Sequence, residues 1–283
     1  MVSVQRLRQC LVTIALLGAT AVFVAGQGDP GGLVPHERGQ DVSPTFDGWV
    51  TNPDGSYSLY FGYLNRNSAE DIAIPIGMDN AVDGPSGPDR GQPTFFYPGR
   101  RWWVYKIVVP KDWPREQRIT WTLQSRGRTN AAKAFLKAEY EVDSVLVGMN
   151  ATDRVLFTNL SEPVERNVPP TISVPGPVRS AIKLSETPTF AVTVADDGLP
   201  SKSTFAAPGV RFRWLLYRGP AKVSFKPETT RTPSPSPAKH ETTVTFSQPG
   251  DYRLRLTASD GELFSTQDID VTVSSGAPAQ PAR

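Results

Sequence analysis

One stretch in the C-terminal half, residues 246–261, limits what this chain can fold into. A Pro-Gly turn signal is followed by the run YRLRLTA at 252–258 and then by Asp260-Gly261. Strict alternation of apolar and polar residues is typical of a strand with one buried and one wet face. Asp-Gly favours a tight hairpin turn, and a second alternating run, DIDVTVS at 268–274, returns along the first. The stretch therefore predicts an antiparallel hairpin, which indicates a fold and not a reaction.

The region around this hairpin has the strand spacing of an immunoglobulin-like sandwich. Between residues 171 and 274, short runs of β-branched and aromatic residues are separated by Pro, Gly and Asp. Trp214 occupies the position of the buried tryptophan of the third strand, and Tyr252 the tyrosine-corner position. Leu254 stands where antibody domains carry a cysteine, so hydrophobic packing replaces the disulfide. These three residues are the predicted markers of the core.

The same residues carry a family resemblance. The Pro-Gly turn with Asp251-Tyr252 and the closing Ala-Ser-Asp-Gly, together with Trp214-Leu-Leu-Tyr-Arg and the segment 194–200, resemble divergent PKD-type domains. The resemblance covers 169–274 and implies an immunoglobulin-like spacer or docking module of an exported protein, without catalytic activity of its own. The Asp-Phe-Gly-Asp-Gly-like signature of the better-known members is absent after Trp214, so its properties are not carried over. No family is recognised in the N-terminal half.

The first residues are typical of a secretory signal. Arg6 and Arg8 precede an uncharged apolar run at 11–25 that ends in small residues, so 1–26 is predicted to be a signal peptide. The run is shorter than a spanning helix needs, and we expect no integral membrane segment after the signal is removed. Cys10 is the only cysteine. The mature chain would then lack thiols, which excludes a disulfide framework and thiolate chemistry.

Composition limits the classes of partner. Without Arg6 and Arg8, the basic residues equal the 28 acidic ones in number. A chain of near-zero net charge has no global electrostatic reason to bind nucleic acid or anionic lipid. The 27 prolines and 23 glycines, with few long helical periods, predict an all-β protein.

We therefore predict two β-sandwich domains in tandem, the C-terminal one immunoglobulin- or PKD-like. The predicted order is a flexible leader, an aromatic-rich N-terminal sandwich, a linker with a proline hinge, the PKD-like domain and a disordered tail. Their expected bounds are 27–43, 44–146, 147–169, 170–274 and 275–283. Proline pairs stiffen linkers, so we expect a restricted orientation between the two domains.

Two segments of this scheme are ambiguous. The loop at 78–93 is longer than most connections in compact domains, so it is either functional or disordered. Residues 130–142 have both helical and alternating character, and a closing strand preceded by a helical turn is favoured. The Ser/Pro-rich segment 226–239 is predicted to be an extended mobile loop, and His240, which directly follows it, is assigned to the same loop.

The first candidate site is aromatic and basic. Trp102 and Trp103 are adjacent on a predicted strand and should point to opposite faces, so one of them needs a second covering layer or an exposed role. Beside Arg100 and Arg101, an exposed tryptophan can stack on a sugar ring or anchor a protein partner. The alternative is that a sandwich edge or the second domain covers it.

Charged residues supply two further candidates. Arg253 and Arg255 should face Asp268 and Asp270 across the hairpin, with Arg211 and Arg213 on the same face, and a solvated charge ladder is favoured over an anion site. The second of these candidates is a group of acidic loop residues that lie at one end of the sandwich and could hold Ca²⁺. They are Asp196, Asp197, Asp260 and Glu262. Asp at turns also has a plain role in binding backbone N–H groups.

Most groups needed for catalysis are missing. The only histidines are His36 and His240, in the predicted leader and mobile loop, so a Ser/His/Asp triad or histidine metal site has no partners. We predict a non-catalytic exported protein, periplasmic, cell-surface or extracellular, whose first domain binds a glycan or an extracytoplasmic protein. The alternatives are a structural subunit of a surface assembly and a polysaccharide-acting enzyme or its accessory.

Overall fold

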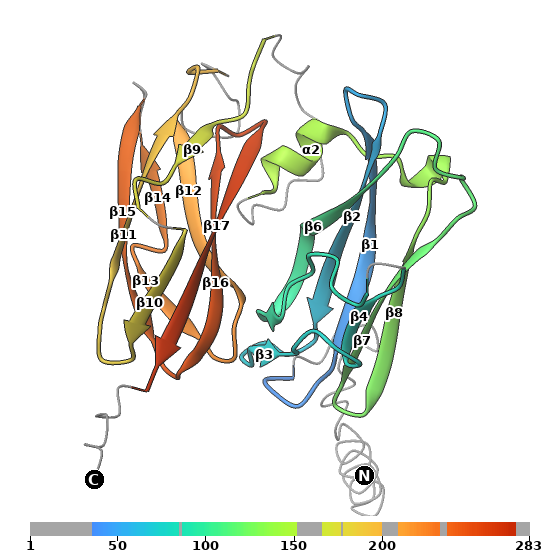
Figure 1. Ribbon diagram of the computed structural model, residues 1–283. Helices are drawn as coiled ribbons and strands as arrows, with labels where there is room; N and C mark the ends of the chain where they lie inside the picture. Colours follow the sequence, from blue (N-terminus) through green and yellow to red (C-terminus); the bar gives the residue numbers. More distant parts are fainter. Residues whose placement is uncertain are drawn as a thin grey trace, which may run out of the picture. The chain divides into compact units, whose positions relative to one another are not determined.

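The computed structural model describes residues 36–84, 87–151, 166–176, 178–199, 209–232 and 237–275. The predicted signal peptide, the start of the predicted leader and the tail beyond Ser275 lie outside these residues. Strands dominate the described chain, which confirms the all-β class and the two sandwiches in tandem (Figure 1). Among the helices of the described residues, none combines the length and apolar character needed to cross a bilayer.

The first sandwich is built from two three-stranded sheets and a short strand pair. One sheet has the order β1-β2-β6, the second β4-β7-β8, and the pair is β3-β5. The strands are β1 (Val42–Thr51), β2 (Tyr57–Asn65), β3 (Ile72–Ala73), β4 (Asn80–Val82), β5 (Phe95–Phe96), β6 (Gly99–Val109), β7 (Ile119–Ser125) and β8 (Arg128–Ala134). The turn between β1 and β2 is closed by the N–H of Gly55, which donates to Asn52 O at 2.9 Å. Asn-Pro-Asp-Gly is a turn sequence, so this hairpin follows from local chemistry.

Large aromatic side chains fill the first core. Trp121 is fully buried, and the rings of Phe61, Tyr105 and Phe96 lie around it at centroid distances of 5.0–6.3 Å. Edge-to-face and stacked arrangements at these distances are favourable beyond the area they bury. The aromatic-rich sequence of this half is thus mainly core material.

The second sandwich also has two sheets. One has the order β13-β15-β11-β9 and the other β10-β17-β16-β12-β14. The strands are β9 (Thr171–Ser173), β10 (Arg179–Lys183), β11 (Thr189–Ala195), β12 (Val210–Arg218), β13 (Val223–Lys226), β14 (Thr229–Thr232), β15 (Ala238–Phe246), β16 (Gly250–Ser259) and β17 (Phe264–Ser274). In Figure 1 these sheets are the yellow to red half of the ribbon.

This strand order is immunoglobulin-like. The sheet β9-β11-β15-β13 matches the A-B-E-D sheet of such domains, and β12-β16-β17 matches C-F-G. The short strand β10 is paired in parallel with β17, from Arg179 opposite Asp270 to Lys183 opposite Ser274. The hairpin of β16 and β17 predicted from sequence is present with continuous antiparallel register from Gly250 to Ser259.

The predicted core markers lie where the immunoglobulin-like pattern puts them. Trp214 and Leu254 are both fully buried in the second core. The hydroxyl of Tyr252 donates to the carbonyl of Gln248 at 2.8 Å, four residues upstream. That bond is the defining contact of a tyrosine corner.

Three local predictions are wrong. The segment 226–239 is not one mobile loop, because β14 pairs with β12 and β15 begins at Ala238. His240 is accordingly a buried β15 residue, whose ring stacks on Phe212 at 4.8 Å between centroids. In 130–142 the order is reversed: the strand β8 comes first and the 3-10 turn η1 (Ala138–Tyr140) follows.

A short helix follows this turn. Helix α2 (Ser144–Met149) begins after Asp143, whose carboxylate accepts the N–H of Val145 at 2.8 Å as an N-cap. It lies across the predicted boundary at 146. A Cβ on Gly148 would collide with the carbonyl of Glu262, so the helix packs directly on the β16–β17 turn. The domain boundaries themselves stay a prediction.

Candidate functional site at the junction of the two sandwiches

Strand β6 is irregular where the sequence has Trp102 and Trp103. Phe61 pairs with Tyr105 and Tyr63 with Arg101, so one β2 residue faces three β6 residues. Trp103 has a φ of 49°, in the left-handed region that non-glycine residues rarely adopt. The expectation of opposite faces is therefore wrong, because this bulge brings the two indole rings together at 5.7 Å between centroids.

Asp47 holds the bulge in place. Its buried carboxylate accepts the N–H of Trp103 at 2.8 Å, the hydroxyl of Thr45 at 2.8 Å and the guanidinium of Arg100. Burial raises the pKa of Asp47, and the charge of Arg100 opposes that rise. A buried ion pair with further hydrogen bonds fixes geometry, so the strained Trp103 backbone has a specific support.

The four predicted ligand residues lie together. Trp102 and Trp103 are half-buried, and the guanidinium carbon of Arg100 lies 3.6 Å from the Trp102 ring centroid. Arg101 lies 5.7 Å from the ring centroid of Tyr97. One face of Trp102 is thus covered by a cation of the same strand. Ligand binding by these residues stays a prediction.

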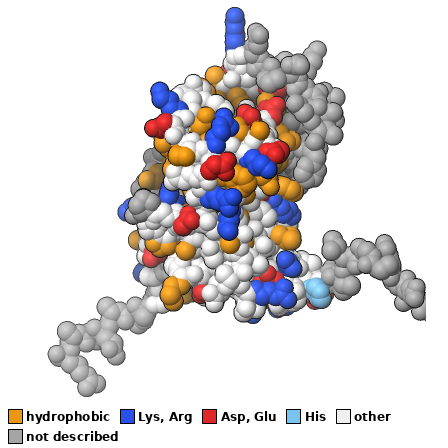
Figure 2. All heavy atoms as spheres, turned by 90° about the vertical axis from the view of Figure 1, so that its right-hand side faces the viewer, with side chains coloured by type: hydrophobic (Ala, Val, Ile, Leu, Met, Phe, Trp, Pro, Cys, Tyr) orange, Lys and Arg blue, Asp and Glu red, His pale blue; other side chains and the backbone are white. Residues whose placement is uncertain are grey.

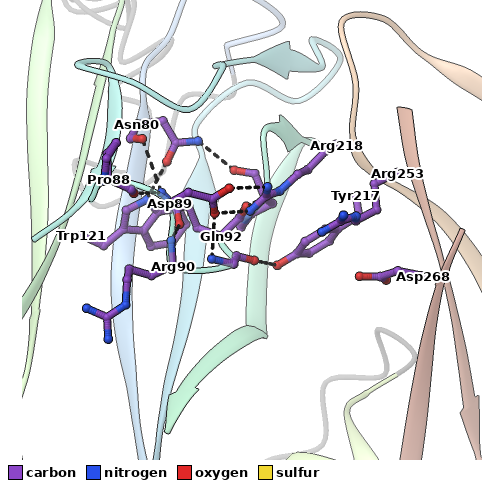
Figure 3. A network of polar contacts seen from close by, with 12 residues as sticks. Asn80, Pro88, Asp89, Arg90, Gln92, Trp121, Tyr217, Arg218, Arg253 and Asp268 are labelled. Carbon is purple, nitrogen blue, oxygen red and sulfur yellow. Dashed lines mark hydrogen bonds and ion pairs between the residues drawn. The ribbon is translucent and has the colours of Figure 1, made fainter. Parts of the chain in front are cut away.

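The loop at 78–93, which was predicted to be either functional or disordered, contacts the second sandwich. Its part at 87–94, called the clasp below, contacts the end of β12 (Figure 3). Both oxygens of Asp89 accept the guanidinium of Arg218, at 2.7 and 2.9 Å, and Gln92 O accepts Arg218 Nε at 2.9 Å. A bidentate pair of this kind fixes orientation as well as adding attraction. The pair lowers the pKa of Asp89.

Backbone groups extend this contact. The N–H of Thr94 donates to Tyr217 O at 3.1 Å, and Thr94 Oγ1 accepts the N–H of Gly219 at 3.1 Å. The hydroxyl of Tyr97 accepts the N–H of Leu216 at 2.9 Å. Burial raises the pKa of Tyr97 to about 12, so this hydroxyl stays neutral. The end of β12 thus uses the first sandwich to satisfy backbone donors and acceptors.

Buried amides organise the clasp from within. Asn80 is fully buried, donates to Pro93 O at 2.8 Å and accepts Trp121 Nε1 at 2.9 Å. Gln92 is fully buried too and donates to Pro88 O at 2.7 Å (Figure 3). Satisfied buried amides specify one backbone path, which explains why a Gly/Pro-rich segment is ordered here.

Each sandwich also contributes an aromatic ring to the core of the other. Tyr217 is 2% exposed in the core of the first sandwich, and Phe95 is 4% exposed in the core of the second. A register shift between Leu216 and Arg218 makes Tyr217 the extra residue of a bulge in β12. This bulge re-aims the ring, whose hydroxyl donates to Gly91 O at 2.5 Å.

A cavity of about 80 Å³, called the junction cavity below, lies where β6 faces β12 and β16. Trp102, Trp103 and Arg101 line it from the first sandwich, and Arg213 and Arg255 from the second. A wider groove of about 670 Å³ opens between Pro75, Ile76 and Thr94 of the first sandwich and the second sandwich, where the end of β12, the start of β16 and parts of β10 and β17 line it. Three of the four predicted ligand residues therefore line the smaller of these two spaces.

The predicted charge ladder is present, but it is not solvated throughout. Arg253 pairs with Asp270 at 2.7 and 3.0 Å, and Arg255 with Asp268 at 2.7 and 2.9 Å. Arg255 is only 17% exposed in its side chain, because the first sandwich covers this end of the sheet. The prediction of a solvated ladder is therefore wrong for Arg255, whose side chain is mostly buried.

The four acidic residues of the predicted Ca²⁺ site, called the acidic constellation below, lie at the linker end of the second sandwich. Asn167 Nδ2 donates to Glu262 Oε2 at 3.2 Å, and Asp197 Oδ2 accepts a linker N–H at 3.0 Å. Asp260 Oδ1 accepts two N–H groups of its own turn at 2.7 Å each. Burial, and then the nearby charge of Asp196, raise the pKa of Asp260 to about 6, while its backbone hydrogen bonds lower it.

This constellation can supply oxygen ligands to a cation. Asp260 is 6% exposed, and its Oδ2 atom, like Asn167 Oδ1, has no hydrogen-bond partner in the described chain. No group of three or more His, Cys, Asp or Glu side chains among the described residues is arranged to hold a metal. A cation here would need amide and backbone oxygens beside Asp196 and Asp260, and Ca²⁺ accepts such donors.

Sequence reasoning missed several of these residues. Asp47 and Tyr217 carry no local signal, because their roles come from bulges and from distant strands. Asn167 lies in the predicted proline hinge, and the clasp lies in the loop of unusual length. An unusual loop length was therefore the one usable signal.

No family model matches the chain. Among solved structures it is similar to the chaperone DraB of E. coli, with 10% identity over 39% of this chain and 57% of that one, at a TM-score of 0.26. It is similar to the D00-D0 domain of intimin, with 8% identity over 83% of this chain and 100% of that one, at a TM-score of 0.27. Domains 4 and 5 of the S-layer protein SbsC give 12% identity, coverages of 83% and 98%, and a TM-score of 0.25.

Proposed function

We propose that this chain is an exported, non-catalytic spacer and interaction module. The predicted signal peptide at 1–26 and the resemblance to PKD-type domains support export and a spacer role. The observation that carries the proposal is the exchange of Tyr217 and Phe95 between the two cores. Independent domains usually meet through small polar interfaces and move relative to one another. Shared core residues instead hold the two sandwiches at one orientation, as a spacer requires.

The proposed partner is an extracytoplasmic protein, and a glycan is the alternative. Arg100 already occupies one face of Trp102, which leaves less aromatic surface for a sugar ring. On the face shown in Figure 2, cationic, anionic and hydrophobic side chains are interspersed, without one dominant charge. The compartment would be the periplasm, the cell surface or the medium.

A structural subunit that assembles through strand edges is a weaker alternative. Strand β10 ends its sheet, and Arg179 and Lys183 are exposed along it. Charged side chains on an edge strand oppose edge-to-edge pairing. The charge pattern of β10 therefore favours a spacer over a polymerising subunit.

The stiffness of the spacer can be measured directly. The mature chain has no cysteine once Cys10 is removed, so Val108→Cys and Glu241→Cys, both at exposed positions, can be spin-labelled as the only thiols. We expect one narrow distance distribution by electron paramagnetic resonance, which Tyr217→Ala broadens. A broad distribution in the unsubstituted chain would contradict the proposal.

The partner class is tested separately. The mature protein is screened on an array of envelope and plant polysaccharides, and cross-linked in the compartment to which it is exported. We expect a cross-linked protein and no glycan signal. Glycan binding that Trp102→Ala or Trp103→Ala removes, in protein that still folds, would instead assign a carbohydrate module.

We propose in addition that the acidic constellation binds Ca²⁺ and stiffens the linker. The buried Asp260 Oδ2 and the Asn167 Oδ1 atom support this, because both are oxygens without a hydrogen-bond partner in the described chain. Asn167 belongs to the linker and Asp260 to the β16–β17 turn, so one cation bound by both would tie the two segments together.

Calorimetric titration with CaCl₂ after removal of metal by EDTA tests this. We expect binding and a rise in thermal stability, both lost in Asp260→Asn. Asp251→Asn is the matched control, since Asp251 is exposed at the other end of β16. If titration with Ca²⁺ releases no heat of binding, or if both variants lose Ca²⁺ binding equally, the calcium proposal is overturned. The spacer proposal would remain intact.

A further inference from the structure

We propose that the wide groove between the two sandwiches binds an extended peptide segment of the partner protein, with side chains of opposite charge on one face of that segment. The inference deepens the proposed interaction role and rests on its claim that the partner is a protein. The groove, and not the junction cavity, has the size of a ligand site, at about 670 Å³ against about 80 Å³. Binding sites typically measure about 300–1,000 Å³.

The groove has stiff apolar walls. Pro75 and Ile76 line it from the first sandwich, and Pro220 and Pro249 line it from the second. All three prolines are exposed, and a proline ring fixes the backbone that carries it. Walls that do not rearrange on binding lose little conformational entropy, so they suit a ligand that is itself flexible, such as a peptide segment.

Direct hydrogen bonds between the sandwiches hold the groove open. Thr94 lines the groove, donates its N–H to Tyr217 O and accepts the N–H of Gly219 through Oγ1, both at 3.1 Å. Arg218, another lining residue, makes the bidentate pair with Asp89 of the clasp. The groove therefore exists before a ligand arrives.

The floor of the groove carries an accessible cation. The strand register places Arg253 of β16 opposite Asp270 of β17, and Asp270 opposite Arg179 of β10. Asp270 accepts Arg253 at 2.7 and 3.0 Å, whereas Arg179 approaches the same carboxylate at 3.9 Å. The side chain of Arg179 is 85% exposed, so its guanidinium can donate to the carboxylate of a ligand.

An exposed anion lies on the same face. Asp251 of β16 is opposite Thr272 of β17, two residues along from Arg253 and Asp270. Side chains two residues apart on a strand point to the same face of the sheet. Asp251 is exposed and accepts the hydroxyl of Thr272 at 2.7 Å. A carboxylate has further acceptor sites, which can receive a basic side chain of the ligand.

The register also sets the spacing between the two charges. Asp251 and Arg179 are separated by two strand spacings of about 4.8 Å and two residue rises of about 3.4 Å, so their Cα atoms lie about 12 Å apart. Residues four positions apart in an extended chain share one face and lie about 13–14 Å apart. A peptide with an acidic and a basic residue at that spacing therefore matches the floor.

The lining is unsuited to a glycan. Among the described residues that line the groove, the aromatic one is Tyr252, which is 3% exposed. A ring buried to this extent presents no face on which a sugar could stack. Proline walls and charges of both signs fit a polypeptide instead.

Binding is tested by fluorescence polarisation with fluorescein-labelled octapeptides rich in Val and Thr, which favour an extended chain. The probe carries Glu and Lys four positions apart, in both orders along the chain, and a control peptide carries Ser in place of both. We expect saturable binding of the probe to the mature protein, several-fold tighter than binding of the control peptide. Equal affinity of the two peptides, or no saturable binding of the probe, would overturn the inference.

Two charge reversals on β10 locate the site. Arg179→Glu should weaken binding of the probe by about tenfold or more, because like charges then face one another. A probe in which Lys replaces Glu should bind this variant better than the original probe does. Lys183→Glu is the matched control, since Lys183 is exposed on the same strand but does not line the groove. Equal loss of binding in both variants would contradict the assignment.

Cross-linking in the compartment to which the protein is exported separates this inference from the proposed function. The yield of a cross-linked protein partner should fall in Arg179→Glu and stay unchanged in Lys183→Glu. A partner captured equally by both variants would overturn the groove as the binding site and leave the proposed interaction role standing. If no partner is captured even by the unsubstituted chain, both proposals fail.

Discussion

The guanidinium carbon of Arg255 lies 3.4 Å from the ring centroid of Tyr217. Arg255 belongs to β16 of the second sandwich, while the ring of Tyr217 is packed in the core of the first. Asp268 holds the guanidinium in the plane required for this stacking. A cation–π contact removed from water stabilises by roughly 2 kcal/mol, so this pair is one of the main contacts between the two sandwiches.

Tyr217→Ala should uncouple the sandwiches. Loss of a buried aromatic ring costs about 3–5 kcal/mol, and here the loss falls on the junction. We expect one calorimetric transition for the unsubstituted chain and two for Tyr217→Ala. Tyr217→Phe keeps the ring and loses only the hydroxyl bond to Gly91, so it should lower stability by about 1 kcal/mol and keep one transition.

Gly62→Ala should disturb the aromatic site through the backbone. A Cβ at Gly62 would collide with the carbonyl of Arg101 and the carboxylate of Asp47. Overpacking of this kind costs about 1–3 kcal/mol. Gly176→Ala, where a Cβ meets nothing within 4 Å, should change the free energy of unfolding by less than about 0.5 kcal/mol. Equal effects of the two substitutions would contradict the described packing.

Tyr252→Phe removes the hydroxyl of the tyrosine corner. The carbonyl of Gln248 then loses its donor, and we expect a loss of about 0.5–1.5 kcal/mol in urea denaturation without a change in slope. Tyr140→Phe, at a 42% exposed ring, serves as the control and should be nearly neutral. A neutral Tyr252→Phe would mean that the corner bond adds nothing to stability.

His240 should make stability depend on pH. Burial lowers the pKa of His240 below the value of about 6.5 of a free histidine, so the folded state resists a proton that the unfolded state accepts. Its contribution to stability is complete above pH 6.5 and is lost as the pH falls from there towards the folded pKa. His240→Phe preserves stacking on Phe212 and should remove this part of the dependence in denaturation series at pH 7.5 and 5.5.

The sequence predicts those features that depend on local pattern. The β16–β17 hairpin, Trp214 and the tyrosine corner follow from strict alternation and from turn residues. Alternation fails at bulges, because one extra residue shifts every following side chain. For that reason the positions of Trp103 and Tyr217 were not predictable from a period of two.

Contacts between segments that are distant in the sequence could not be predicted either. The clasp depends on Asp89 and Gln92 contacting Arg218, which follows more than 120 residues later, and on Asn80 accepting Trp121 Nε1. Length alone left the same loop as either functional or disordered. The pairing of Arg253 and Arg255 with Asp270 and Asp268 could be predicted, because all four residues belong to one hairpin. The burial of Arg255 could not be predicted, because the residues that cover it belong to the first sandwich.

The parallel pairing of β10 with β17 has a mechanical consequence. The two strands lie near the beginning and the end of the second sandwich, from Arg179 opposite Asp270 to Lys183 opposite Ser274. Tension applied between the two ends of this domain would slide the strands along one another, so their hydrogen bonds would bear the load together and not open one by one. The second sandwich is therefore built to resist stretching along the chain.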